Sequence, residues 1–187
     1  MNIAGSYDLD APSEDIWPLI FDPAELLHLI PGCEQIEQTG PGEYRGCLNL
    51  RIAAVGGTFQ TTLKIIDSQP PFYSRFDGEA AGTGGIIKGQ ADFRLTEAGS
   101  QTHLTYEGQA QITGPLGSLN ARLVEGVAQA LIHQGLDKLN AQLHAQSATL
   151  LISQSQQKSE RGGIWRWLKR LMERLRRALR APQRKPI

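Results

Sequence analysis

The stretch Ile86-Ile87-Lys88-Gly89-Gln90-Ala91-Asp92-Phe93-Arg94-Leu95-Thr96 decides the fold, because apolar or small residues alternate in it with charged or polar ones. Successive side chains of a β-strand point to opposite faces of a sheet. The alternation therefore predicts a strand with one buried and one solvated face, as in antiparallel sheets. It continues in residues 102–112, where Leu104, Tyr106 and Ile112 share the inward face.

Further strands are expected upstream. Alternation of the same kind runs through residues 43–54 and 58–68, and another strand is expected around residues 72–80. Gly56-Gly57 and Pro70-Pro71 separate these segments, and both residue types favour turns. Together with a first strand at residues 2–9, the pattern predicts an antiparallel meander of six strands over about residues 33–113, with one buried face.

Two short helices are expected between the first strand and the meander. Ser13 is a candidate cap for the first helix, with acidic residues in its first turn. Pro18 and Pro23 interrupt the apolar run that follows, and Asp22 can cap a second helix from Pro23 to Leu29.

A long helix is expected after Gly114-Pro115, from about Leu116 to the region of Leu143. One apolar stripe can lie on the sheet: Leu116, Leu119, Leu123, Val127 and Leu131. Beyond Gly135 the leucines at 136, 139 and 143 fall on a different side, which implies a bend or a second contact surface, including a dimer face. Strands covered by a long helix indicate the α+β class.

The carboxy-terminal segment differs in charge from the rest. Residues 158–187 hold 11 Lys/Arg and 2 Asp/Glu, which leaves 8 basic and 17 acidic residues in 1–157. Residues 164–181 predict a basic amphipathic helix, and the Gln/Ser/Gly-rich residues 147–163 predict a flexible linker behind a body at 1–146. The apolar side of the helix holds Trp165, Leu168, Leu171, Met172, Leu175 and Leu179, with Trp167 at its border. The polar side holds Arg166, Lys169, Arg170, Arg174 and Arg177.

Such a helix is typical of segments that lie on an anionic membrane surface. Docking on a partner protein and binding to nucleic acid are the alternatives, but the acidic body argues against nucleic acid. No signal peptide is recognised, and no stretch approaches the roughly 20 apolar residues needed to span a bilayer. We therefore expect a cytoplasmic protein attached peripherally to the inner face of the cell membrane.

Four further stretches carry a family resemblance: Leu29-Ile30-Pro31-Gly32-Cys33-Glu34, Gly42-Glu43-Tyr44, Gly82-Thr83-Gly84-Gly85-Ile86-Ile87-Lys88-Gly89 and Arg122-Leu123-Val124-Glu125-Gly126-Val127-Ala128. With the element order, they resemble the CoxG family of the carbon monoxide dehydrogenase cluster over about residues 1–144. The inserted Ile30 is a conservative departure from the usual pattern. The resemblance implies the START-like helix-grip fold of the SRPBCC superfamily, a curved antiparallel sheet wrapped around a long C-terminal helix. It also implies a noncatalytic adaptor that recruits a molybdenum hydroxylase of the carbon monoxide dehydrogenase type to the membrane.

The expected inner face mixes aromatic residues with small ones at positions 46, 89, 91, 108 and 110, which can leave a cavity beneath the helix. Its predicted lining is Leu50, Phe59, Leu63, Phe76, Phe93, Tyr106, Leu123 and Val127. The glycines could instead mark bulges or a close approach of the helix, and the aromatic residues ordinary core. No inward position carries a charge, so a ligand should be long and apolar, such as a lipid or an isoprenoid quinone.

No catalytic or metal-binding motif is recognised, and no covalently bound cofactor is expected. His28, His103, His133 and His144 lack metal-ligand spacing, and Cys33 and Cys47 are expected to be unreactive thiols. The glycine-rich residues 84–89 lack the Gly-Lys-Ser/Thr ending of a phosphate loop. The alternatives to an adaptor are a stand-alone START-like protein that binds an apolar molecule and an assembly chaperone for the molybdenum enzyme.

Overall fold

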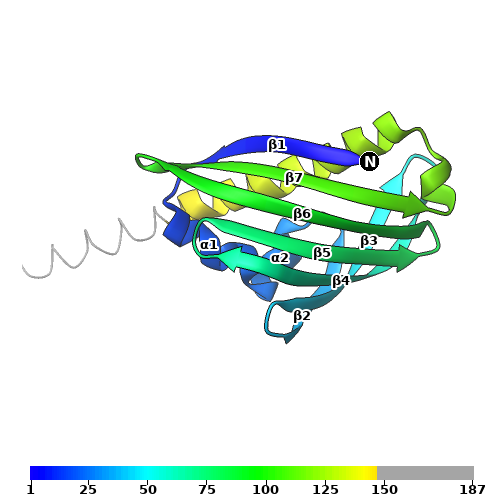
Figure 1. Ribbon diagram of the computed structural model, residues 1–187, viewed down its shortest axis with the longest axis horizontal. Coiled ribbons are helices and arrows are strands. Elements are labelled where there is room, and N and C mark those ends of the chain that lie inside the picture. The colour runs from blue at the N-terminus through cyan, green and yellow to red at the C-terminus, as the bar shows by residue number, and fades with distance from the viewer. Residues whose placement is uncertain (147–187) are drawn as a thin grey trace, which may run out of the picture. The chain divides into compact units, whose positions relative to one another are not determined.

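The computed structural model describes residues 1–146, in which seven antiparallel strands form one sheet (Figure 1). The order across the sheet is β1-β7-β6-β5-β4-β3-β2. The strands are β1 Asn2–Leu9, β2 Cys33–Gly40, β3 Glu43–Ile52, β4 Val55–Gln69, β5 Tyr73–Gly82, β6 Gly85–Ala98 and β7 Gln101–Thr113. The predicted six-strand meander is confirmed as β2 to β7, and β1 pairs with β7 at its far edge.

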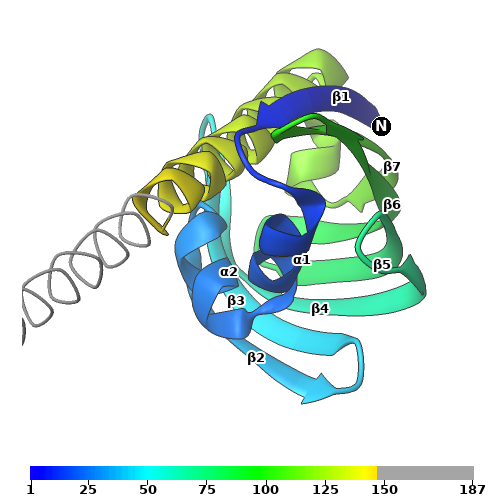
Figure 2. The same ribbon diagram turned by 90° about the vertical axis from the view of Figure 1, so that its left-hand side faces the viewer.

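The helices lie on the concave side of the curved sheet (Figure 2). They are α1 Ser13–Phe21, α2 Pro23–Leu29, the short 3-10 helix η1 Pro115–Ser118 and a long helix over residues 121–146. Asp22 caps α2 as predicted, since its carboxylate accepts a hydrogen bond from the Ala24 N–H at 2.9 Å. The chain thus has the predicted α+β fold, a curved antiparallel sheet wrapped around a long helix.

Two local predictions for α1 are wrong. Ser13 does not cap α1: Pro12 occupies the N-cap, and the Ser13 hydroxyl donates instead to Glu97 Oε1 at 2.7 Å. Pro18 does not end the helix but lies within it. Ser13 is fully buried, so its hydroxyl is satisfied by a tertiary partner and not by the turn of its own helix.

The long helix begins later than predicted. Pro115 opens the separate helix η1, and Asn120 then starts the long helix, its side-chain oxygen accepting a hydrogen bond from the Arg122 N–H at 2.9 Å. Leu116 and Leu119 therefore precede the helix, and the stripe counted from Leu116 does not continue into it with a helical period.

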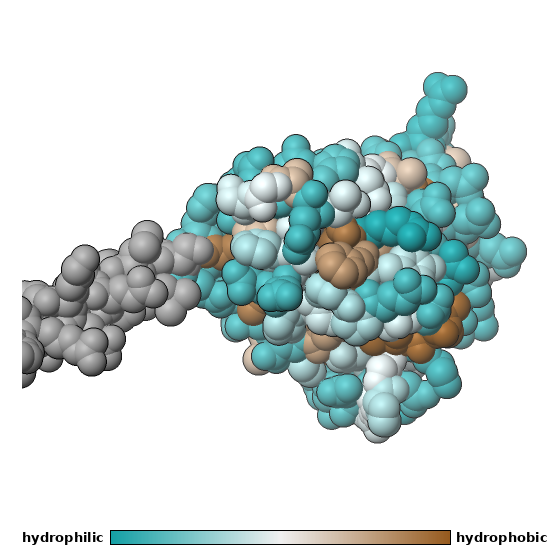
Figure 3. Space-filling model, turned by 60° about the vertical axis from the view of Figure 1, so that its left-hand side comes forward, coloured by the Kyte–Doolittle hydropathy of each residue, from teal (hydrophilic) through white to brown (hydrophobic). Residues whose placement is uncertain are grey.

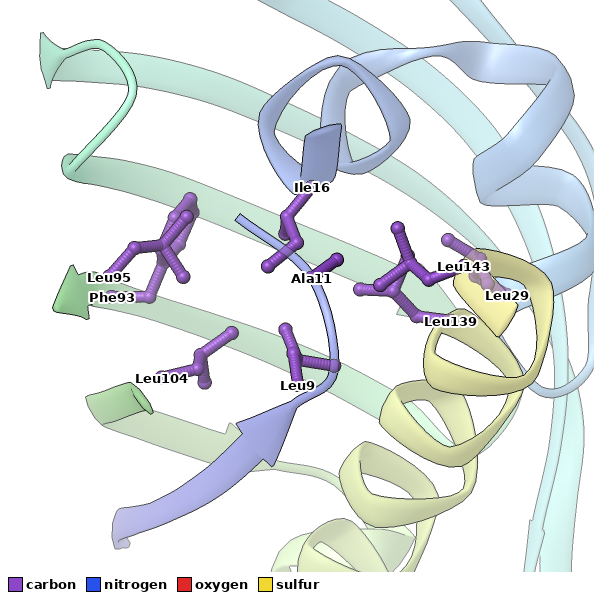
Figure 4. Close-up of a cluster of buried hydrophobic side chains, with 9 residues drawn as sticks. All are labelled: Leu9, Ala11, Ile16, Leu29, Phe93, Leu95, Leu104, Leu139 and Leu143. Atoms are coloured by element: carbon purple, nitrogen blue, oxygen red, sulfur yellow. The ribbon is translucent and has the colours of Figure 1, made fainter. Parts of the chain in front are cut away.

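The core is divided into two clusters at opposite ends of the sheet. The first cluster consists of Leu9, Ala11, Ile16, Leu29, Phe93, Leu95, Leu104, Leu139 and Leu143 (Figure 4). The second cluster consists of Ile52, Phe59, Ala80, Leu116 and Val124. One continuous helix serves both, with Val124 in the second cluster and Leu139 and Leu143 in the first. The leucines beyond Gly135 are accounted for by the core, without a bend or a dimer face.

The outer face of the sheet is polar. Cross-strand ion pairs join Lys64 to Glu43 at 2.9 Å and Lys88 to Glu79 at 3.0 Å. Seen from the side of α1, the surface is largely hydrophilic, with a few separate apolar areas (Figure 3). Within residues 1–146, no helix is both long and apolar enough to cross a membrane.

Candidate ligand-binding site

A band of small side chains crosses the middle of the inner face, between the two core clusters. In register, Gly78 pairs with Gly89 and Gly89 with Ala110, and in the next row Ala91 pairs with Gly108. These five positions are called the small-residue band below. Side chains this small leave room between a sheet and a covering helix, which is where helix-covered sheets can hold a ligand.

The space above Gly78 is open. A Cβ atom added there would have only two heavy atoms within 4 Å outside its own chain neighbours, the Thr62 carbonyl oxygen at 3.7 Å and Leu63 Cδ1 at 4.0 Å. Both belong to the neighbouring strand β4, so no atom of the long helix comes this close. The helix approaches the backbone elsewhere, since a Cβ added at Gly135 would lie 3.1 Å from the Leu29 carbonyl oxygen. A close helix approach therefore does not explain the glycine at 78.

Gly78 is absent from the small residues identified by sequence. The alternation Phe76-Asp77-Gly78-Glu79-Ala80 could have found it, because it places Gly78 on the inward face between two inward apolar residues. The sequence prediction gives this strand only as a segment around residues 72–80, without assigning its two faces.

The eight residues predicted to line a cavity do not gather around one recess. Phe59 is fully buried in the second cluster, with Leu50 and Val127 packed against that cluster. Phe93 is buried in the first cluster, with Phe76 and Tyr106 packed against it. Most of the predicted lining thus belongs to the two ends of the core, and contact of these side chains with a ligand stays a prediction.

Three of the eight border the small-residue band. Phe76 pairs with Ala91 in register, and Leu63 pairs with Gly78. Tyr106 pairs with Phe93, one row further toward the first cluster. Leu123, in contrast, is 44% exposed on the flank of the long helix, away from the band.

The Tyr106 hydroxyl is a buried polar atom without a hydrogen-bond partner, the one such side-chain atom found in residues 1–146. It lies over Gly5, where an added Cβ would collide with it. Desolvation by burial raises the pKa of Tyr106, so the group stays protonated at neutral pH. It offers one hydrogen bond in otherwise apolar surroundings.

Aromatic rings line the first-cluster end of the inner face. Trp17 lies 4.9 Å from Phe21 and 5.8 Å from Phe93 between ring centroids, with tilted ring planes. Trp17 comes from α1 and is not among the predicted site residues. Its position in a nine-residue helix gives no periodic signal that could have placed it beside Phe93.

Two open recesses lie outside the space between sheet and helix. One, of about 890 Å³, crosses the outer face of the sheet among polar side chains that include Arg45, Lys64 and Gln90. The other, of about 320 Å³, lies along the long helix and is bordered by Leu123, Val127 and neighbouring residues. Neither combines an apolar lining with enclosure.

The described residues hold no evident reactive centre. Burial raises the pKa of the Cys33 thiol, which opposes formation of the reactive thiolate. Cys47 Sγ lies 3.8 Å from Glu34 Oε2, and both cysteines are free thiols. No group of three or more His, Cys, Asp or Glu side chains is placed to hold a metal ion within residues 1–146.

The predicted linker 147–163 and membrane-binding helix 164–181 lie outside the described residues. Their assignments, including the residues predicted to contact lipid, stay predictions.

Comparison with known proteins gives a family and a fold. The model of the carbon monoxide dehydrogenase family CoxG matches residues 5–144. A conserved protein from Geobacillus kaustophilus is 28% identical, with a TM-score of 0.74 over 78% of this chain and 96% of that one. A comparison with curated proteins finds no match.

Two more distant structures share the fold alone. A START superfamily protein from Mycobacterium smegmatis is 14% identical, with a TM-score of 0.58 over 76% of this chain and 98% of that one. The Zhui aromatase/cyclase from Streptomyces sp. R1128 is 16% identical, with a TM-score of 0.52 over 75% and 90%. The helix-grip fold is thus confirmed as START-like, and the second neighbour is by its name an enzyme.

Proposed function

Because the chain belongs to the CoxG family of carbon monoxide dehydrogenase, we propose that it binds a long apolar molecule between the small-residue band and the long helix. The observation that carries this proposal is the open space above Gly78, at the centre of a band of small inward residues. Membership of this family and the START-like fold both suggest a hydrophobic ligand.

The ligand is apolar because of the surfaces that face it. Inward positions beside the band are Phe76, Leu63 and Tyr106, while the charged side chains of the same strands take part in ion pairs on the outer face. A charged head group placed on the inner face would lose its hydration without gaining a partner. A lipid or an isoprenoid quinone meets this requirement, and the Tyr106 hydroxyl could donate to one carbonyl oxygen.

The protein acts, on this account, as a noncatalytic adaptor for a molybdenum hydroxylase of the carbon monoxide dehydrogenase type. The family name associates its members with that enzyme. The basic amphipathic residues 164–181 hold the adaptor to anionic lipid on the cytoplasmic face of the membrane. A quinone ligand would fit this role, since a membrane-recruited oxidising enzyme needs an electron acceptor that resides in lipid.

Gly78→Val tests the site. The new methyl groups enter the open space above the band, so affinity for a short-chain isoprenoid quinone, measured by native mass spectrometry, should fall at least tenfold. Folding should be retained, because a β-branched residue in a strand interior is more favourable than glycine and the added Cβ meets ordinary contact distances.

Gln90→Val is the matched control, since it places the same side chain on the outer face of the neighbouring strand β6. It should bind the quinone as the unmodified chain does. Unchanged affinity in Gly78→Val, or an equal loss in both variants, would show that the ligand does not occupy the space above the band.

A further inference from the structure

Three segments meet at the end of the body that holds the second core cluster. The Leu116 N–H donates to the Gly84 carbonyl oxygen at 2.9 Å, and Ile86 pairs with Thr113 in register. A Cβ added at Gly57 would collide with the Thr83 hydroxyl, which places the β3–β4 and β5–β6 turns side by side. Residues 51–58, 81–87 and 112–123 are called the loop end below; it lies at the right in Figure 1.

The loop end is free of acidic residues, although the body is acidic. Its three segments contain Arg51 and Arg122 and no Asp or Glu, whereas residues 1–157 hold 17 acidic and 8 basic residues. Both arginines are exposed, and neither forms an ion pair with another residue in 1–146. The lysines on the outer face of the sheet, in contrast, are paired with Glu43 and Glu79.

Apolar side chains accompany these charges. Ile86 is 40% exposed and Leu123 is 44% exposed, and both belong to the loop end. Leu123 also borders the apolar recess of about 320 Å³ on the long helix, beside Gly126, whose added Cβ would meet no atom within 4 Å. Exposed large apolar side chains next to unpaired arginines, on an otherwise acidic body, mark a surface for an anionic and apolar partner.

We propose that the loop end of the body docks on the surface of an anionic lipid bilayer. Arg51 and Arg122 contact lipid phosphates, and Ile86 and Leu123 insert at the level of the head groups. An acidic protein surface would match the arginines, but the solvent-exposed isoleucine and leucine on separate segments suit a deformable lipid surface better. This contact is additional to the one proposed for residues 164–181, and it places the second-cluster end of the sheet against the membrane.

Hydrogen–deuterium exchange of the full-length chain locates the contact. With vesicles of phosphatidylcholine containing about a third phosphatidylglycerol, we expect slower exchange in residues 51–58, 81–87 and 112–123 than without vesicles. The outer-face residues of β4 to β6 should exchange unchanged, as should the loop end with vesicles of phosphatidylcholine alone. Protection of the outer face in place of the loop end would overturn the proposal.

Two matched pairs of variants test the side chains. Ile86→Asp should abolish the loop-end protection, whereas Ile66→Asp, at a residue 43% exposed on β4, should leave it intact. Arg51→Glu should weaken vesicle partitioning about fivefold or more, the effect of one basic residue at an anionic surface. Arg45→Glu, at an exposed arginine on the same strand β3, should have a smaller effect. Equal effects within each pair would contradict the assignment.

The proposal is separable from the anchoring role of residues 164–181. In the Leu168→Glu and Leu175→Glu double variant, loop-end protection should persist at saturating vesicle concentration. Its complete loss there would show that the body has no lipid contact of its own. Protection of the loop end that requires added molybdenum hydroxylase, and not lipid, would reassign the surface to a protein partner.

Discussion

Two buried tyrosines of the body differ in what their hydroxyl groups meet. Tyr44 donates to the Phe21 carbonyl oxygen at 3.0 Å, whereas the Tyr106 hydroxyl has no partner. A buried polar group left unpaired costs about 1–3 kcal/mol, and a satisfied hydrogen bond contributes about 1 kcal/mol net. The two residues therefore predict opposite outcomes for the same substitution.

Tyr106→Phe should raise the free energy of unfolding by about 1 kcal/mol, because it removes the unpaired hydroxyl and keeps the ring. Tyr44→Phe should lower the free energy of unfolding by about 1 kcal/mol, because it leaves the Phe21 carbonyl without its donor. Urea denaturation of ligand-free protein measures both. A loss of stability in Tyr106→Phe as large as that in Tyr44→Phe would mean that the Tyr106 hydroxyl is hydrogen-bonded after all.

At the scale of elements, one carboxylate joins β1, β7 and the long helix. Asp10 accepts hydrogen bonds from Gln101 Nε2 at 2.5 Å and Asn140 Nδ2 at 3.1 Å, and it pairs with His144 Nε2 at 2.9 Å. These contacts, the one from Gln101 first, hold the pKa of Asp10 below its ordinary value of 3.8. A depressed folded-state pKa means that the contribution to stability is present above the ordinary pKa and is lost as the pH falls through the lower one.

Asp10→Ala should lower the melting temperature at pH 7 and speed hydrogen exchange at the end of the long helix near residues 137–144. The difference in melting temperature from the unmodified chain should shrink as the pH falls below about 4, where Asp10 becomes protonated. Glu37→Ala, at an exposed residue of β2, is the control and should show neither effect. A difference that does not change with pH would rule out the carboxylate as its source.

The strands were predictable and the placement of the long helix was not, for physical reasons. Alternation is a local property, so segments such as 86–96 reveal their strand and its buried face without reference to the rest of the chain. The stripe from Leu116 through Leu123 assumes one uninterrupted helix. Pro115 and Asn120 divide that segment, so the helical phase restarts at 121 and turns Leu123 outward.

The candidate site was predictable only in part for a similar reason. Small residues at 89, 91, 108 and 110 are recognisable from alternation, and the structure joins them with Gly78 into one band. Which aromatic residues belong to the core depends on the position of the helices over the sheet, and that is a tertiary property. Phe59 and Phe93 thus proved to be core members at opposite ends.

At the scale of the whole molecule, opposite charges are separated along the chain. Residues 158–187 carry 11 basic and 2 acidic residues, against 8 basic and 17 acidic in the remainder. Leu168→Glu combined with Leu175→Glu should abolish cosedimentation with anionic vesicles at low lipid concentration, because it places two charges on the apolar side of the proposed helix. Binding of the unmodified chain should also weaken with salt.

Ser155→Glu combined with Gln157→Glu is the matched control for this anchor. It introduces the same two charges into the proposed linker 147–163 and should retain most of the vesicle binding. Equal losses in the two double variants would reduce the anchor to a net-charge effect, and intact binding in Leu168→Glu with Leu175→Glu would refute it.

The central claim is that the body holds an apolar molecule, and native mass spectrometry with lipid extraction tests it most directly. The full-length protein would be purified from the membranes of its own host without added ligand. We predict a copurified isoprenoid quinone or lipid that is lost in Gly78→Val. An empty protein that also fails to bind added short-chain quinone or lipid would contradict the account.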